Sequence, residues 1–479
     1  MRRAKIVATL GPALDDPARL RAAIGAGIDV VRLNFSHGSH DEHERRLEQV
    51  RATATALGRN VGALGDLQGP KIRLGILPDD GVELADGGEV LLQAGVEELD
   101  AYDDGAGTAV LPVVYEQLAD DVEPGALILI DDGLLRLVVS RVDGDTVSAR
   151  VVAGGVAKTR KGVNLPGVDV SAKALTEKDR ADLEAMVGMG VDWIALSFVR
   201  DPGDVREVRD LVHDMGGEAP IIAKLERPEA IDRVEQIIEA TDAVMVARGD
   251  LGVEIGPERV PALQKQIIDL ANRESKPVIT ATEMLDSMIR SPRPTRAEVS
   301  DVANAIFDGT DAVMLSGETA AGRFPVEAVR TMARIIEAAE SSPQYIHSLT
   351  PPKPGLSLAR VVAKAAVQVA KDVDARALLV FSLSGSSVQL VSKFRPSVPL
   401  LGLTPRVQPM RRLALMWGTE GVQVPTEDTS RALILAAEEV CLRQGLAATG
   451  DPVVIVSGIP GGHGGTNRLL VHRIGNAPD

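Results

Sequence analysis

Short apolar runs alternate with amphipathic helical patterns along most of the chain, and this alternation constrains the fold more than any other feature of the sequence. Eight such runs end in polar residues: 4–9, 28–34, 61–66, 192–198, 220–225, 242–247, 277–281 and 311–315. Helical patterns follow most of them, over 179–188, 202–214, 228–239, 258–273, 296–307 and 326–340. Successive strand-helix units are typical of a parallel sheet covered by helices. Eight units predict an α/β fold, a (β/α)8 TIM barrel.

The regular spacing breaks between the third and fourth runs. Residues 71–164 form short β-like segments separated by Gly, Asp and Pro turns, so we expect an inserted β domain, folded as a small β-barrel. Between 72 and 157 there are 18 acidic residues and four arginines, whereas the basic cluster 158–161 follows at the exit. This cluster lies near a hinge that faces the barrel mouth, which is consistent with a lid.

The C-terminal part follows a polar, proline-containing linker around 341–356. Its expected strands lie near 376–382, 398–403, 420–424, 452–457 and 468–474 and alternate with helices. We therefore predict a separate C-terminal α/β domain over 355–479. The other predicted domains are the barrel, over 1–70 and 165–340, and the inserted lid, over 71–164.

Charge and composition exclude several classes of partner. A formal charge of −16 and a pI near 5.0 argue against nucleic acid and anionic membranes as partners, because both need a basic face. No apolar run reaches the ~18 residues of a membrane span. The single cysteine, Cys441, cannot form an internal disulfide, and the first residues lack the apolar core of a signal peptide. We expect a cytoplasmic protein.

Polar side chains gather at the ends of the predicted barrel strands, where barrels of this class hold their chemistry. These residues are Thr9, Arg32, Asn34, Asp66, Ser197, Lys224, Glu226, Asp250, Thr282 and Ser316. Lys224 and Glu226 are two residues apart on a strand, so their side chains share one face, and Asp250 follows one strand later. Two carboxylates beside a lysine suit Mg²⁺ bound to a phosphorylated ligand. The pattern favours phosphoryl transfer.

Arg32 has two interpretations. An arginine that points into a barrel needs an anionic partner, because an unpaired buried guanidinium is costly. The partner is either Asp66, in an internal ion pair, or the phosphate of a ligand. The lysine and the two carboxylates nearby favour the phosphate.

Other residues also leave alternatives open. Lys224 could form a Schiff base, as in barrel aldolases, but such an enzyme has no need of the two neighbouring acids. Thr282 and Ser316 either cap short helices or line the site. The glycine turn at 248–252 could present backbone N–H groups to an anion.

Two further clusters have plainer explanations. His37, His40 and His43 are spaced for a metal, but no fourth ligand is evident, so we interpret them as a solvated helix face. A serine-rich turn in the C-terminal part either caps a helix or holds a regulatory phosphate. Its residues are Ser382, Ser384, Gly385, Ser386 and Ser387.

Several segments together resemble the pyruvate kinase family: 30–38, 62–73, 161–167, 219–227, 246–256, 280–298 and 311–325. The most specific motif runs from Arg290 to Asn304 and leads into the segment 311–320. The resemblance covers essentially the whole chain. It implies a glycolytic homotetramer that transfers the phosphoryl group of phosphoenolpyruvate to ADP, giving pyruvate and ATP. A magnesium-dependent pyruvate aldolase or lyase is the alternative, but it explains no inserted lid.

By motif position, the resemblance implies a role for each site residue. Glu226 and Asp250 resemble the ligands of Mg²⁺, with Mn²⁺ an alternative metal, and Lys224 resembles the cation that stabilises the phosphoryl group in transit. Arg32 resembles the residue that holds the substrate phosphate. The other implied roles are Gly249, Asp250 and Thr282 for the substrate carboxylate, Asn34, Phe35, Ser36, His37, Arg73 and Lys161 for the nucleotide, and Thr282 and Ser316 for a proton-donating water.

The segment 66–71 resembles the potassium-independent branch of the family. Lys71 would supply the positive charge that K⁺ otherwise brings, so we expect that K⁺ is not required. The remaining cation site would comprise Asn34, Ser36, Asp66 and Leu67. The serine-rich turn at 382–387 resembles the family's phosphosugar site and implies a phosphorylated small-molecule effector.

Overall fold

Eight parallel strands close into a barrel in the computed structural model, which describes residues 2–171, 174–343, 345, 351–353, 357–426, 429–458 and 465–476. β1 pairs with both β2 and β16, so the first and last strands close the ring. The predicted TIM barrel is confirmed. The strands are β1 (Lys5–Thr9), β2 (Val30–Asn34), β3 (Gly62–Asp66), β12 (Trp193–Leu196), β13 (Ile221–Leu225), β14 (Ala243–Ala247), β15 (Val278–Ala281) and β16 (Ala312–Leu315).

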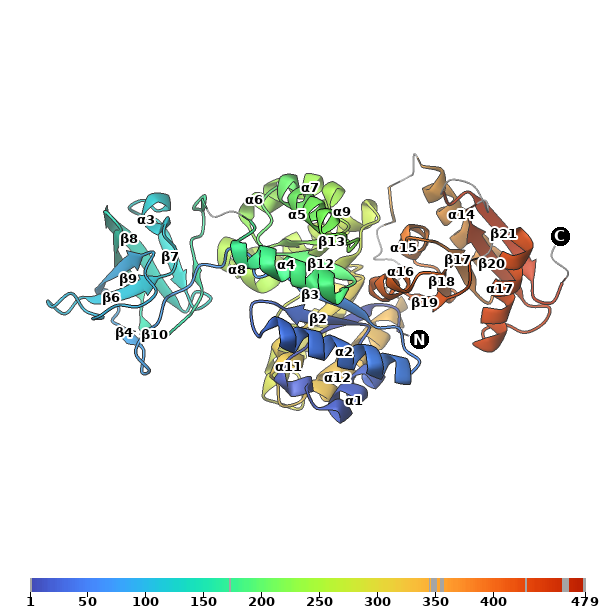
Figure 1. Ribbon diagram of the computed structural model, residues 1–479, viewed down its shortest axis with the longest axis horizontal. Coiled ribbons are helices and arrows are strands. Elements are labelled where there is room, and N and C mark those ends of the chain that lie inside the picture. Colours follow the sequence, from blue (N-terminus) through green and yellow to red (C-terminus); the bar gives the residue numbers. More distant parts are fainter. Residues whose placement is uncertain are drawn as a thin grey trace.

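Helices surround the barrel on its outside (Figure 1). They are α1 (Pro17–Ala26), α2 (His40–Ala56), α4 (Glu177–Met189), α5 (Pro202–Asp214), α6 (Pro228–Asp232), α7 (Val234–Ala240), α8 (Arg248–Ile255), α9 (Val260–Arg273), α10 (Arg296–Phe307), α11 (Gly317–Ala320) and α12 (Pro325–Glu340). The helix expected over 228–239 is divided into α6 and α7 at Arg233. Capping boxes begin α2 at Ser39, α4 at Thr176 and α10 at Thr295, which satisfies backbone N–H groups that each first turn leaves free.

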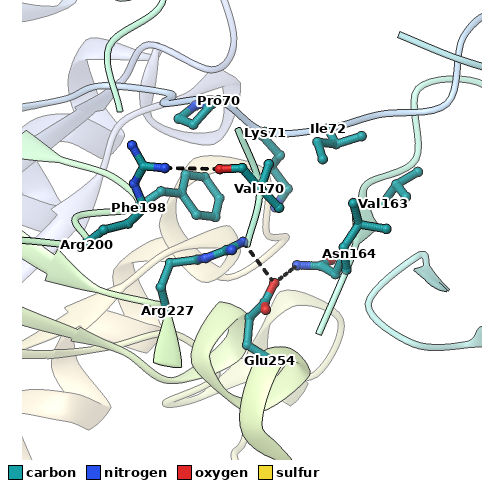
Figure 2. A pocket seen from close by; sticks show the side chains of 11 residues that line it. Pro70, Lys71, Ile72, Val163, Asn164, Val170, Phe198, Arg200, Arg227 and Glu254 are labelled. Carbon is teal, nitrogen blue, oxygen red and sulfur yellow. Dashed lines mark hydrogen bonds and ion pairs between the residues drawn. The ribbon is translucent and has the colours of Figure 1, made fainter. Parts of the chain in front are cut away.

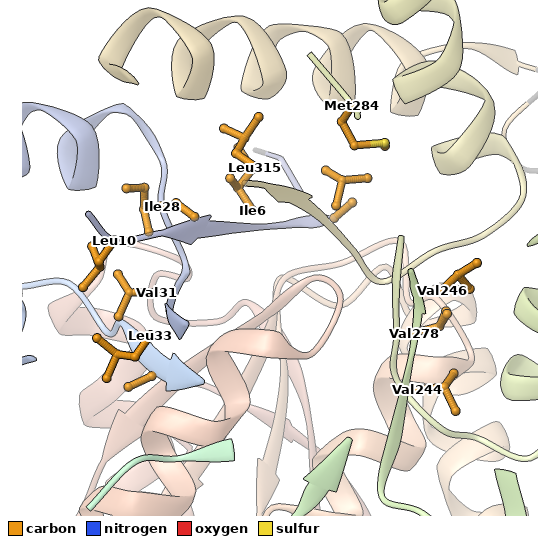
Figure 3. Packing of buried hydrophobic residues seen from close by; sticks show 14 of the residues in the cluster. Ile6, Leu10, Ile28, Val31, Leu33, Val244, Val246, Val278, Met284 and Leu315 are labelled. Carbon is orange, nitrogen blue, oxygen red and sulfur yellow. The ribbon is translucent and has the colours of Figure 1, made fainter. Parts of the chain in front are cut away.

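Alternate residues of the barrel strands pack on opposite sides. Ile6, Leu33 and Val246 belong to the core between strands and helices (Figure 3). Val7 and Met245, their neighbours in sequence, belong to a second core cluster that also contains interior residues of the other strands. The barrel is therefore filled by side chains and leaves its chemistry to the rim.

The insertion between β3 and α4 is a β structure with a core of its own. A six-stranded sheet has the order β11-β7-β8-β9-β5-β6, and β4 and β10 form a separate ladder. Residues 72–75 bridge the two edge strands of this sheet, because Leu74 pairs with Val113 in β6 and Arg73 pairs with Gly162 beside β11, which agrees with the expected small barrel. The elements are β4 (Val82–Leu84), β5 (Glu89–Ala94), β6 (Ala109–Val113), α3 (Leu118–Asp121), β7 (Leu127–Ile130), β8 (Leu135–Asp143), β9 (Thr146–Ala153), β10 (Gly155–Ala157) and β11 (Val163–Asn164).

The C-terminal α/β domain packs on the opposite side of the barrel from the insertion (Figure 1). Its sheet has the order β19-β18-β17-β20-β21, parallel except for β21. The Lys5 ammonium at the start of β1 donates to the Thr419 carbonyl at 2.7 Å, so this domain covers the amino ends of the barrel strands. Its elements are α14 (Leu358–Asp372), β17 (Leu378–Phe381), α15 (Ser386–Lys393), β18 (Leu400–Thr404), α16 (Val407–Arg412), β19 (Thr419–Gln423), α17 (Ser430–Arg443), β20 (Pro452–Ser457) and β21 (Arg468–Arg473).

Among the described residues, no helix has the length and apolar character needed to cross a membrane.

Candidate active site

A buried charge cluster lies at the carboxyl ends of two barrel strands. Lys224 Nζ is 2.9 Å from Glu226 Oε1 and 3.3 Å from Asp66 Oδ1. The three residues belong to β13, the segment just after it, and β3. All three are buried, so their charges act with little screening by water. The predicted convergence of Lys224 and Glu226 on one face is present.

The cluster fixes the protonation of its members. Burial by itself lowers the pKa of Lys224, but Asp66 and Glu226 outweigh that effect and raise it. Burial by itself raises the pKa of Asp66, but Lys224 and Arg32 lower it below its ordinary value. Lys224 therefore stays an ammonium at neutral pH, which suits a group that stabilises negative charge rather than a Schiff-base nucleophile.

Arg32 at the end of β2 forms the internal ion pair that the sequence left open. Its Nε donates to Asp66 Oδ2 at 2.6 Å, and its Nη1 donates to Thr9 Oγ1 at 3.2 Å. A guanidinium has five N–H donors, so these two bonds leave donors for an anion. The pair with Asp66 and the binding of a phosphate are compatible.

Glu226 and Asp250 fit a divalent cation that also takes oxygens from a ligand. Glu226 Oε1 is buried beside Lys224 without a hydrogen bond, and burial followed by the repulsion of Asp250 raises the pKa of this carboxyl. Mg²⁺ is usually held by one or two carboxylates, with water and phosphate completing its shell. The described residues contain no group of three or more His, Cys, Asp or Glu placed to hold a metal.

Thr282 is held against the first turn of α8. Its hydroxyl oxygen accepts from the Gly249 N–H at 2.8 Å, and both Thr282 (φ +66°) and Glu283 (φ +54°) have left-handed backbone. Non-glycine residues in this region are strained, and such strain clusters at functional sites. Arg248 supports the turn by donating to the Thr282 carbonyl at 2.7 Å and to Asp301 Oδ1 at 2.7 Å. The role of Arg248 was missed because it depends on contacts between separate loops.

Ser316 follows β16 and precedes α11, but its side chain makes no capping hydrogen bond. Its backbone N–H donates to Glu318 Oε2 at 2.7 Å, while Glu318 Oε1 accepts from the Leu285 N–H at 3.0 Å. The buried carboxylate of Glu318 thus joins the loops after β15 and β16. The alternative interpretation of Ser316 as a helix cap is not supported.

Ser197 is a site residue for which the sequence suggested no role beyond its place at a strand end. Its hydroxyl lies 2.6 Å from Lys224 Nζ and donates to the Leu67 carbonyl at 2.7 Å. The hydroxyl thereby links the ammonium to the loop after β3. Its position after β12 was the only signal in the sequence.

The expected nucleotide residues fall into two groups. Asn34 ends β2, and Phe35, Ser36 and His37 follow it on the barrel. Burial, followed by the charges of Arg73 and Arg32, lowers the pKa of His37. Arg73 and Lys161 belong to the insertion, where Arg73 donates to the Arg160 carbonyl at 3.0 Å and Lys161 pairs with Asp131 at 2.9 Å. In the described part of the chain, their hydrogen bonds and ion pairs stay within the insertion.

A small cavity lies where the insertion joins the barrel, and Figure 2 shows its lining. Glu254 of α8 accepts from Asn164 Nδ2 at 3.0 Å and lies 3.7 Å from Arg227 Nη1. Arg200 donates to the Val170 carbonyl at 3.0 Å. These contacts attach the returning segment of the insertion to the barrel.

Lys71 lies at the same junction and points to Asp250, one of the two expected metal ligands. Its Nζ is 3.1 Å from Asp250 Oδ1. Among the residues of the expected cation site, Asn34 Oδ1 accepts from the Ser36 N–H at 3.3 Å, Asp66 pairs with Arg32 and Lys224, and the Leu67 carbonyl accepts from Ser197 at 2.7 Å.

The interpretation of His37, His40 and His43 as a solvated helix face is wrong for His43. His43 is 3% exposed, and its ring stacks on Phe35 with centroids 4.4 Å apart. Stacking on a buried aromatic ring removes it from solvent, which a helical pattern alone does not reveal. His40 pairs with Asp182 at 2.7 Å.

The serine-rich turn lies in the C-terminal domain, away from this cluster. The Gly385 N–H donates to Ser382 Oγ at 2.9 Å, and Ser384 Oγ donates to Ser386 Oγ at 3.0 Å. Ser387 bonds to Thr466. Gly385 has a φ of +91° and precedes α15 without a side-chain cap, so the turn is not a simple serine cap.

Comparisons with known proteins agree along the whole chain. The family model "Pyruvate kinase, barrel domain" matches residues 1–329, and "Pyruvate kinase, alpha/beta domain" matches residues 360–472. Pyruvate kinases of Agrobacterium vitis and Mycobacterium tuberculosis are each 46% identical over 477 residues, covering 99% of both chains. The pyruvate kinase of Geobacillus stearothermophilus is 45% identical over 482 residues and is 80% covered. The crystal structure of a pyruvate kinase from Cryptosporidium parvum superposes with a TM-score of 0.90 at 34% identity, covering 99% of this chain and 96% of that one. The chain belongs to the pyruvate kinase family, whose members are phosphotransferases.

Proposed function

We propose that this protein transfers the phosphoryl group of phosphoenolpyruvate to ADP, giving pyruvate and ATP in the last step of glycolysis. One observation carries the proposal beyond family membership. The buried ammonium of Lys224 lies between Asp66 and Glu226 at the barrel rim, close to the guanidinium of Arg32. Fixed positive charge beside a carboxylate pair matches a phosphoryl group that carries its charge on several oxygens as it is transferred.

The proposed binding roles are those that the family resemblance implies. Arg32 and Lys224 hold the phosphoryl group, and the Asp250 backbone with Gly249 and the Thr282 hydroxyl hold the substrate carboxylate. Thr282 and Ser316 orient the water that protonates the enolate. Glu226 and Asp250 would hold Mg²⁺, or Mn²⁺ in its place, and the bound cation would supply positive charge that neutralises the transferring phosphoryl group.

The nucleotide is bound between two parts of the molecule. Asn34, Ser36 and His37 contact it from the barrel, with Phe35 contributing only through its backbone, because its ring is buried. Arg73 and Lys161 contact it from the insertion. We therefore propose three domains, a barrel (1–70 and 165–340), a lid (71–164) and a C-terminal domain (355–479), with the lid closing over the barrel mouth.

The proposal also covers the need for K⁺, the binding of an effector and the oligomeric state. Lys71 supplies the charge of a monovalent cation, so K⁺ is not required; its contact of 3.1 Å with Asp250 supports a charge role beside the metal. The turn from Ser382 to Ser387 binds a phosphorylated small-molecule effector. The active form is a cytoplasmic homotetramer.

A magnesium-dependent aldolase or lyase is not favoured. The net pKa of Lys224 is raised rather than lowered, which opposes Schiff-base chemistry. The insertion with Arg73 and Lys161 has no role in such a reaction.

The direct test is pyruvate formation from phosphoenolpyruvate and ADP with Mg²⁺, in potassium-free buffer and in buffer containing K⁺. Equal activity in both supports the reaction and the role of Lys71. Activity only with K⁺ keeps the reaction and removes the argument for Lys71. No pyruvate in either buffer would overturn the proposed reaction and favour the lyase.

A further inference from the structure

The loop after β2 is held in place by side chains of two helices that bind its backbone carbonyl groups. The Phe35 carbonyl accepts from Lys178 Nζ at 2.7 Å, and the His37 carbonyl lies 2.9 Å from His43 Nε2. The two anchors come from different helices, since Lys178 belongs to α4 and His43 to α2. The loop is therefore clamped at two points that flank Ser36.

The ring of Phe35 holds the same loop from inside. It is 2% exposed and lies between two imidazoles, stacked on His43 at 4.4 Å and tilted against His40 at 5.9 Å. Asn34 and Ser36, by contrast, are only partly buried. Alternate residues thus divide into a buried anchor and side chains that remain available to a ligand.

Asp182 orients Lys178, the residue that binds the Phe35 carbonyl. It is 3% exposed, its Oδ2 accepts from Lys178 Nζ at 2.6 Å, and its Oδ1 lies 2.7 Å from His40 Nε2. One buried carboxylate therefore fixes both the lysine that binds the Phe35 carbonyl and one of the rings that contact Phe35.

Helix stability alone does not explain Lys178, although its i,i+4 ion pair with Asp182 contributes to α4. The residue is the second of α4, where the positive end of the helix dipole disfavours a cation. Its side chain is 51% exposed, so the core does not require it either. The bond to Phe35 in another loop is the feature that distinguishes it from an ordinary surface lysine.

The same end of α4 also holds the segment that leads into the insertion. Asp179 is buried and accepts from the Gly69 N–H at 3.0 Å, while serving the capping box with Thr176. The first turns of α4 therefore hold both the loop after β2 and the start of the hinge.

We propose that Lys178 and Asp182 of α4, together with His43 of α2, are positioning residues for the nucleotide: they fix the backbone of residues 34–37 so that Asn34, Ser36 and His37 face ADP without further ordering. None of the three touches the nucleotide. The inference rests on the proposed function, which makes this loop the barrel side of the nucleotide site.

Steady-state kinetics of Lys178→Met test the proposal, with ADP and phosphoenolpyruvate varied separately. Losing one charge-assisted hydrogen bond should raise KM for ADP by about fivefold or more. KM for phosphoenolpyruvate and kcat should stay near the wild-type values, because the lost interaction serves binding of the nucleotide alone. His43→Phe keeps an aromatic ring against Phe35 but removes the bond to the His37 carbonyl. This variant should also raise KM for ADP.

Two variants act as controls. Arg180→Met removes a cation from the same helix, where Arg180 pairs with Glu207 at the surface, and should leave all constants unchanged. Lys178→Arg keeps a cationic donor and should retain most of the affinity for ADP. An unchanged KM for ADP in Lys178→Met, or an equal rise for both substrates, would overturn the proposal.

Binding of ADP without phosphoenolpyruvate, measured by calorimetry, separates this inference from the proposed function. A wild-type protein that binds ADP but forms no pyruvate would overturn the reaction and leave the positioning role to be judged from the binding of Lys178→Met. A catalytically active protein whose Lys178→Met variant binds ADP normally would overturn only the positioning role.

Discussion

At the scale of single residues, the site depends on one ammonium shared by two buried carboxylates. Neither Asp66 nor Glu226 is accessible to bulk water, and each has Lys224 within 3.3 Å. Removing the lysine therefore removes the positive charge that faces the transferred group and leaves like charges close together.

Lys224→Met should lower kcat by about 10²–10³-fold, the range found when a preorganised donor to a developing charge is removed. The affinity for ADP should change little, because the nucleotide loop does not contact Lys224. Initial rates and ADP binding check this, with circular dichroism to establish that the variant is folded. A kcat within tenfold of the wild type would contradict the assigned role.

Lys71→Glu should convert the protein into a potassium-dependent enzyme. The substitution replaces a cation 3.1 Å from Asp250 with an anion, so a monovalent cation becomes necessary to restore the local charge. Activity is measured across a K⁺ series at constant ionic strength, with Lys71→Met as the neutral control. A variant indifferent to K⁺ would refute the assignment of Lys71.

At the scale of elements, the hinge segment between β3 and the insertion is tightly restrained. Gly69 has a φ of +68°, and a Cβ there would lie 2.8 Å from the Phe198 ring and 3.0 Å from Ser197 Cβ. Gly58, in the loop before β3, has a similar φ of +61° but no neighbour within 4 Å of a Cβ.

Gly69→Ala should therefore destabilise the barrel by about 1–3 kcal/mol more than Gly58→Ala, because overpacking is added to the shared backbone strain. It should also lower activity, since Ser197 contacts Lys224. Denaturation midpoints and initial rates of the two variants provide the comparison. Equal midpoints would show that the hinge relaxes around the added methyl group.

The elements also show where sequence reasoning succeeds. The eight barrel strands were predictable because buried parallel strands are continuous apolar runs with a polar residue at the carboxyl end. The division of one helix at Arg233 and the burial of His43 were not, because a helical pattern shows neither the break nor the stacking of the ring on Phe35. The support of Thr282 by Arg248 was not either, because the two residues are 34 positions apart in the chain. Lys224, Glu226 and Asp250 could be grouped because a barrel brings its strand ends together.

At the scale of the whole molecule, a buried ion pair joins the C-terminal domain to the base of the barrel. Lys393 at the end of α15 lies 2.5 Å from Asp311 Oδ2, and Arg395 Nη1 lies 3.0 Å from Asp311 Oδ1. Asp311 precedes β16, whose other end leads to Ser316. The helix that begins at the serine-rich turn therefore ends against a barrel strand that leads to the active site.

This pair should make stability rise with pH in the alkaline range. Burial lowers the pKa of Lys393 from 10.5 to about 8, despite the attraction of Asp311. Between these values the unfolded chain holds a proton that the folded chain has lost, so the free energy of unfolding increases with pH across that window. Denaturation midpoints from pH 7 to 11 should rise for the wild type relative to Lys393→Met. A constant difference would contradict the lowered pKa.

The pairing of β1 with β16 also determines how the protein can be made on the ribosome. Residues 5–9 cannot take their final place until residues 312–315 have been synthesised. At typical synthesis rates of about 5–20 residues per second, the first three strands wait roughly 12–50 s for their last neighbour. During that interval the insertion, which has its own core, can complete its folding. The nascent barrel therefore keeps an unpaired edge at β1 until the last strand emerges, and unpaired strand edges are prone to aggregation.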